Sequence, residues 1–116
     1  MTSKVTVYHN PRCSKSREVM KYLEAQGVQV HVVEYLKAPL TEDELAALVR
    51  RLGIAPHDLV RTKEPIYRQL GLDADAPDDV ILRAMSEHPI LMERPVVVTS
   101  KGAVIGRPLD RIHAIL

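Results

Sequence analysis

The chain has a single cysteine, Cys13, among its 116 residues, and it has neither tryptophan nor phenylalanine. One cysteine cannot form an internal disulfide bond, so its thiol is either an inert buried group or a reactive one. The core must be mainly aliphatic, because the chain has four tyrosines and no phenylalanine or tryptophan. The apolar runs are far shorter than the ~20 residues that span a bilayer, and the N-terminus shows no signal-peptide or transit-peptide pattern. We therefore expect a cytoplasmic protein that does not associate with membranes.

The charge of the chain is small in total and uneven along its length. The net charge is +1, yet residues 39–93 carry eleven acidic side chains against six basic ones, and both ends are basic. Ten of the sixteen cationic residues are arginine, which favours bidentate binding of oxyanions. Neither end has a run of Lys and Arg, a stacking platform or a nucleic-acid motif, so we expect no nucleic-acid partner.

Hydrophobic periodicity predicts an alternation of strands and helices. The expected elements are a strand at 4–9, a helix from Ser14 to just before Gly27, a strand at 28–36, a helix between Thr41 and Gly53, a helix at 77–88 that stops at Pro89, two short strands within 94–106 and a final helix at 108–116. This order is typical of an α/β, thioredoxin-like (glutaredoxin-like) mixed sheet with flanking helices and an inserted helical segment. We expect a single domain over residues 1–116, with the insertion at about 40–92.

The setting of Cys13 favours a reactive thiol. If a helix begins near Ser14, Cys13 lies at its N-terminus, where unpaired backbone N–H groups and the helix dipole stabilise a thiolate. Arg12, Lys15 and Arg17 place cations within four residues of it. The alternative is that Cys13 is a small buried apolar residue, the usual fate of a free cysteine.

Three arginines far from Cys13 have unusual neighbours. Arg94 and Arg107 each precede a proline at the two ends of the predicted strand pair, and Arg61 follows an apolar Asp-Leu-Val segment. Each of them taken alone is equally well explained as a solvated surface residue. His9, four residues before Cys13, either tunes the thiol or closes the first strand, and the remaining histidines have no metal-ligand spacing, so we expect no metal.

Four segments together resemble the glutaredoxin-coupled arsenate reductases of the ArsC type. They are YHNPRCSKSR, LVRTKEPIY, HPILMERPVVV and GRP, and the resemblance runs in register from about Val5 to Pro108. It implies that Cys13 is the nucleophile, that the arsenate oxygens are bound by three arginines, and that the thiol is supported by nearby residues. The implied catalytic residues are Cys13 and His9, the latter in the position that supports the ionised thiol. The implied oxyanion-binding residues are Arg61, Arg94 and Arg107, and the supporting residues are Arg17, Ser16 and Pro95, the last as a cis-proline.

The resemblance also implies the reaction, which is reduction of arsenate to arsenite with glutathione as co-substrate and glutaredoxin as partner. The cysteine count agrees, because reduction of As(V) to As(III) takes two electrons and this chain supplies one thiol. Ser16 stands at the second position of a C-x-x-C pair, and Val19 stands where a phosphatase-like C-x5-R loop needs arginine. We expect a monomer without a bound cofactor. Two alternatives stay open: a family member that acts on a substrate other than arsenate, and a redox regulator that binds RNA polymerase and resembles the Spx type.

Overall fold

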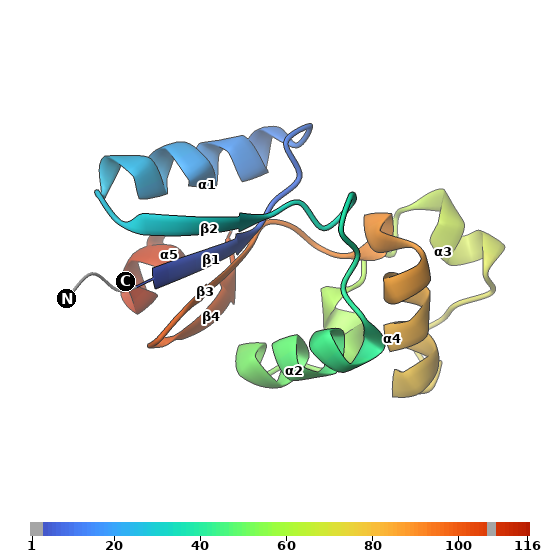
Figure 1. The fold of residues 1–116 in the computed structure, drawn as a ribbon. Helices are drawn as coiled ribbons and strands as arrows, with labels where there is room; N and C mark the ends of the chain where they lie inside the picture. The colour runs from blue at the N-terminus through green and yellow to red at the C-terminus, as the bar shows by residue number, and fades with distance from the viewer. Residues whose placement is uncertain (1–3, 107–108) are drawn as a thin grey trace. The chain divides into compact units, whose positions relative to one another are not determined.

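The computed structural model describes residues 4–106 and 109–116 of the chain (Figure 1). The elements are β1 (Lys4–Tyr8), α1 (Ser14–Ala25), β2 (Gln29–Val33), α2 (Glu42–Leu52), η1 (Pro56–Leu59), α3 (Pro65–Gln69), α4 (Asp78–Glu87), η2 (Pro89–Leu91), β3 (Val96–Thr99), β4 (Gly102–Ile105) and α5 (Leu109–Ile115). The chain divides into two compact units. The first runs up to Ala38 and resumes at Arg94, and the second is Pro39–Glu93. The second unit spans the segment where the sequence predicts a helical insertion, and the single domain over residues 1–116 stays a prediction.

The first unit is built on a mixed four-stranded sheet. Its strand order is β2-β1-β3-β4, with β1 parallel to β2 and β3 antiparallel to both β1 and β4. Because β1 and β2 are parallel, the chain between them must cross over, and α1 makes that crossover (Figure 1). The α/β class with a mixed sheet and flanking helices is therefore confirmed.

Alternating valines in β1 determine which face of the sheet is buried. Val5 and Val7 have 1% and 0% of their surface exposed, and they pack with Val19 and Leu23 of α1 and with Ile112 of α5. Val19 and Leu23 are four residues apart, so they lie on one face of their helix. This packing holds α1 against one face of the sheet.

Local capping signals set the helix ends where the sequence predicts them. The Thr41 side chain accepts a hydrogen bond from the Glu44 backbone N–H at 3.1 Å, and the Glu44 carboxylate accepts one from the Thr41 N–H at 3.0 Å. Such a capping box stabilises a helix start by about 1 kcal/mol. Gly53 ends α2 with φ of 70°, a left-handed conformation that favours glycine.

The second strand is shorter than expected. The sequence predicts a strand at 28–36, but β2 ends at Val33, because the Lys37 and Ala38 N–H groups both donate to the Glu34 carbonyl and form a turn. Val32 is 40% exposed, since β2 lies at the edge of the sheet. A periodic apolar pattern in the sequence indicates a strand, but it does not indicate how much of the strand other elements bury.

The second unit is helical and contains short elements that the sequence analysis did not predict. These are η1, α3 and η2, which span only three to five residues each and are therefore too short for a periodic pattern. Val60 and Met92 form an isolated antiparallel bridge beside η1 and η2. Within residues 4–106 and 109–116, no helix is long and apolar enough to cross a membrane.

Candidate active site

The loop that carries Cys13 is held by its own backbone and by Asn10. The Cys13 N–H donates to the Asn10 carbonyl at 3.0 Å, and the Arg12 N–H donates to Asn10 Oδ1 at 3.0 Å. This turn places Cys13 at the N-cap of α1, where it is partly exposed. No side chain caps the helix at this position, so the first-turn N–H groups face the thiol.

The pKa of the Cys13 thiol is lowered from its ordinary value. Burial acts first and raises the pKa, but the backbone N–H groups of Ser16 and Lys15 lower it, and the hydrogen bond and positive charge of Arg94 lower it further. The direction agrees with the predicted reactive thiol and disagrees with an inert buried one. The source of the positive charge differs from the prediction, because it comes from Arg94 rather than from Arg12, Lys15 and Arg17.

Sheet pairing explains why Arg94 reaches Cys13 across 81 positions of sequence. Tyr8 at the end of β1 pairs with Val96 at the start of β3, and the two strands are antiparallel. The residues that follow Tyr8 therefore lie beside the residues that precede Val96. The Arg94–Pro95 peptide bond in that segment is cis, as the family resemblance implied.

Ser16 connects His9 to the cysteine loop. Its side chain is fully buried, and its Oγ lies 2.8 Å from His9 Nδ1 and accepts a hydrogen bond from the Asn10 N–H at 3.1 Å. Burial lowers the pKa of His9, the charge of Glu34 raises it and the charge of Arg17 lowers it, so that the net shift is downward. The neutral imidazole is therefore favoured, and the Ser16 hydroxyl connects it to the Asn10 backbone of the loop.

Arg17 supports the same loop from the helix. Its Nη1 donates to the Pro11 carbonyl at 3.0 Å. The predicted supporting residues Ser16, Arg17 and Pro95 are thus all in the first unit with Cys13, His9 and Arg94. Their catalytic roles stay predictions.

Gly106 is a residue that the sequence analysis did not single out. Its N–H donates to the Pro95 carbonyl at 2.7 Å, and a Cβ at this position would lie 2.8 Å from Pro95 Cγ and 3.2 Å from Val19 Cγ2. Only glycine lets the backbone approach Pro95 this closely. The glycine of the Gly-Arg-Pro segment could have indicated this close contact, but the segment was interpreted for Arg107 alone. Arg107 itself lies outside the described residues, and its role stays a prediction.

Arg61 belongs to the second unit, and its side chain is less exposed to solvent than that of a typical surface arginine. Its side chain is 24% exposed, with Nη1 2.7 Å from Glu64 Oε1 and Nε 3.5 Å from Glu93 Oε1. Its backbone N–H donates to the Leu91 carbonyl at 2.7 Å. Arg61 is therefore partly shielded and ion-paired, and its predicted convergence on Cys13 stays a prediction.

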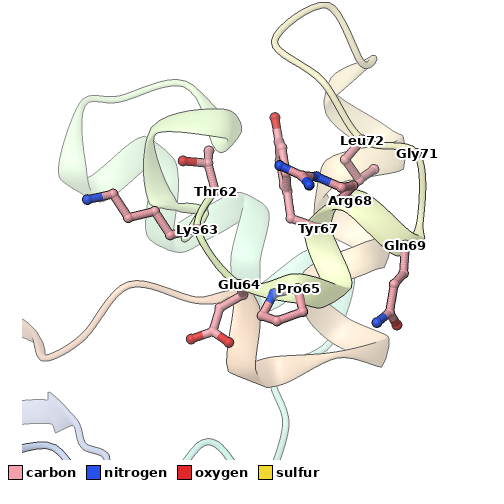
Figure 2. Close-up of a pocket in the computed structure, with 9 residues that line it drawn as sticks. All are labelled: Thr62, Lys63, Glu64, Pro65, Tyr67, Arg68, Gln69, Gly71 and Leu72. Carbon is pink, nitrogen blue, oxygen red and sulfur yellow. The ribbon is translucent and has the colours of Figure 1, made fainter.

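Each unit also carries a surface hollow. One of about 270 Å³ borders the cysteine loop and is lined by Asn10, Pro11, Arg12, Glu34, Leu36 and Lys37. A larger one of about 870 Å³ follows Arg61 in the second unit, and Thr62, Tyr67 and Arg68 are among the residues that line it (Figure 2). Tyr67 is held there by a 2.7 Å hydrogen bond to His57 Nε2. Within the described ranges, no three His, Cys, Asp or Glu side chains gather as metal ligands.

Comparison with known proteins places the chain in one family. The model of the ArsC family matches residues 8–115. An arsenate reductase of Neisseria meningitidis is 42% identical over 97% of each chain, and an uncharacterized protein of Escherichia coli, YfgD, is 42% identical over 100% of this chain and 99% of its own. The structure of an arsenate reductase from Vibrio cholerae has a TM-score of 0.95 and 42% identity over the whole of both chains. The chain, with a lowered thiol pKa at a helix N-terminus beside Arg94, belongs to the ArsC family.

Proposed function

We propose that this protein reduces arsenate to arsenite through Cys13, with glutathione and glutaredoxin as the external thiols. The observation that supports this most is the Cys13 thiol itself, which is partly exposed at the N-terminus of α1 and has its pKa lowered by two backbone N–H groups and by Arg94. The arsenate reductases of Neisseria meningitidis and Vibrio cholerae, both 42% identical to this chain, support arsenate as the substrate.

The proposed chemistry uses three thiols, and two of them, those of glutathione and glutaredoxin, are oxidised to a disulfide as As(V) becomes As(III). The Cys13 thiolate attacks arsenic and displaces one oxygen as water, and a glutathione thiol displaces a second oxygen in the same way. A glutaredoxin thiolate then attacks the glutathione sulfur, and the electron pair of the sulfur–arsenic bond stays on arsenic, which becomes As(III). Glutathione leaves as a mixed disulfide with glutaredoxin, and hydrolysis of the Cys13–arsenic bond releases arsenite. The external thiols are needed because Cys13 is the only cysteine.

The other site residues are proposed to prepare this attack. Arg94, which donates a hydrogen bond to Cys13, is suited to neutralise charge on an oxyanion beside the thiolate. Arg61 and Arg107 are proposed to bind further arsenate oxygens, because the family resemblance assigns them this role. His9, held neutral and bonded to Ser16, is proposed to keep the loop in its attacking geometry. We propose that the protein works as a monomer in the cytoplasm, where the glutathione pool is located.

A coupled assay tests the function. NADPH consumption with glutathione reductase, glutathione, glutaredoxin and arsenate should be lost in Cys13→Ser and whenever glutaredoxin is omitted. If Cys13 is alkylated with a low apparent pKa but the protein does not turn over arsenate, the assignment of arsenate as the substrate is contradicted. Another oxyanion or a glutathionylated protein would then be favoured as the substrate. Specific capture of RNA polymerase by such a protein would favour the regulator instead.

A further inference from the structure

Two parallel strands of the sheet end side by side, and a hollow lies beyond their ends. Tyr8, the last residue of β1, pairs in register with Val33, the last residue of β2, and the His9 N–H donates to the Val33 carbonyl at 2.8 Å. Because the strands are parallel, the loops that follow them leave the sheet at the same edge. Both loops line the hollow of about 270 Å³, through residues 10–12 and through Glu34, Leu36 and Lys37. The hollow therefore borders Cys13, which directly follows residue 12.

This hollow presents charges of both signs that a ligand can reach. The Lys37 ammonium lies 3.7 Å from the Glu34 carboxylate, and these side chains are 80% and 41% exposed. An ion pair this exposed contributes little to stability, so both groups can turn to a ligand. Arg12 is exposed as well and adds a second positive charge, and Leu36 adds an apolar contact surface. The charged side chains of the lining are therefore two cations and one carboxylate.

Glutathione, an external thiol of the proposed function, carries the complementary charges. Near neutral pH it has two carboxylates, one ammonium group and a mostly protonated thiol. Its γ-glutamyl end holds a carboxylate and the ammonium group on the same carbon atom, whereas its glycyl end has a carboxylate alone. A group with both signs on one carbon matches the Glu34 carboxylate and the Lys37 ammonium, which lie 3.7 Å apart. The γ-glutamyl end is therefore the better fit.

The size of the hollow suits one end of glutathione and not the whole tripeptide. Pockets that enclose a whole small ligand measure about 300–1,000 Å³, and this hollow measures about 270 Å³. A tripeptide extends over about 10 Å, so the thiol can lie beyond the hollow while the γ-glutamyl end stays in it. Cys13 is within that reach, because it directly follows Arg12 of the lining.

We propose that the hollow beyond β1 and β2 is a glutathione-binding site, and that it holds the γ-glutamyl end of the tripeptide. The inference rests on the role of glutathione as co-substrate in the proposed function. The α-carboxylate of the ligand binds Arg12 and Lys37, and its ammonium group binds Glu34. The methylene groups of the γ-glutamyl chain pack against Leu36. The ligand thiol then extends toward Cys13.

A titration of the full chain, followed by the NMR signals of its backbone amides, tests the site. The ligand is S-methylglutathione, whose blocked thiol cannot react with Cys13. The amide signals of Arg12 and Lys37 should shift on binding, and Lys37→Gln should raise the dissociation constant about three- to tenfold, the scale of one charged contact. The matched control is Lys21→Gln, which removes the same charge from an exposed position of α1 outside the hollow. It should leave the dissociation constant unchanged.

A second ligand, N-acetyl-S-methylglutathione, tests which end of glutathione is bound, because acetylation removes the ammonium charge. The unchanged protein should bind it about three- to tenfold more weakly than S-methylglutathione. Glu34→Gln should bind the two ligands about equally, because the partner of the ammonium group is gone. The control Glu24→Gln, which removes an exposed carboxylate from α1, should keep the preference.

The outcomes separate this inference from the proposed function. The inference is overturned if the unchanged protein does not bind S-methylglutathione, if it binds both ligands equally, or if Lys37→Gln binds as tightly as the unchanged protein. Arsenate reduction with glutathione that continues in any of these cases leaves the proposed function standing. Binding with the expected preference but without arsenate turnover rejects the proposed function and supports the glutathione site.

Discussion

Replacing Ser16 with alanine should destabilise the protein by an amount that the structure sets. The substitution removes a fully buried hydroxyl and leaves His9 Nδ1 and the Asn10 N–H without their partner. A buried polar group that loses its partner costs about 1–3 kcal/mol, and Asn10 is only partly buried, so we expect a total loss of about 2–4 kcal/mol. With a urea m-value of about 1–3 kcal/mol per molar, the unfolding midpoint should fall by about 1 M or more.

The matched control is Ser14→Ala, the same change at an exposed position in the first turn of α1. Surface substitutions of this kind are usually within about 0.5 kcal/mol, so its midpoint should stay close to that of the unchanged protein. Arsenate turnover should fall in Ser16→Ala and not in Ser14→Ala, because His9 loses its link to the loop. Equal urea midpoints for the two variants would refute the buried network around Ser16.

Three further outcomes are expected in the same unit. Iodoacetamide alkylation of Cys13 as a function of pH should give an apparent pKa below that of a free thiol. Arg94→Ala should raise this apparent pKa, whereas Arg12→Ala should not. Equal effects of the two substitutions on the apparent pKa would show that Arg94 does not act on the thiol. Gly106→Ala should lower stability by about 1–3 kcal/mol through overpacking against Pro95, whereas Gly102→Ala, whose Cβ meets only an ordinary contact at 3.4 Å, should be tolerated in thermal melts. Because burial lowers the pKa of His9 in the folded state, the unfolded chain takes up the proton first. Stability should therefore decline as pH falls from the ordinary value of 6.5 through the lowered pKa, and a His9→Gln variant should lack this decline in urea titrations.

Local signals in the sequence predicted the helix boundaries well. The capping box of Thr41 and Glu44 and the left-handed Gly53 act between neighbours in sequence, so they could be recognised without a fold. The position of Cys13 at the start of α1 was recognisable for the same reason. The short helical elements of the second unit were missed, because three to five residues carry too little pattern.

The sequence by itself determined the thiol chemistry of this protein: one cysteine, placed after a strand and before a helix, beside backbone N–H groups that lower its pKa. It also supplied Glu64, three residues from Arg61, as a local partner. Only the tertiary structure decided which charge reaches the thiol, because Arg94 arrives through the antiparallel pairing of β1 and β3 rather than through proximity in sequence. It likewise decided that Glu93 faces Arg61, since that contact depends on backbone hydrogen bonds between segments 32 residues apart. Electrostatic interactions act over a few ångströms in space, and only folding converts positions in a chain into such distances.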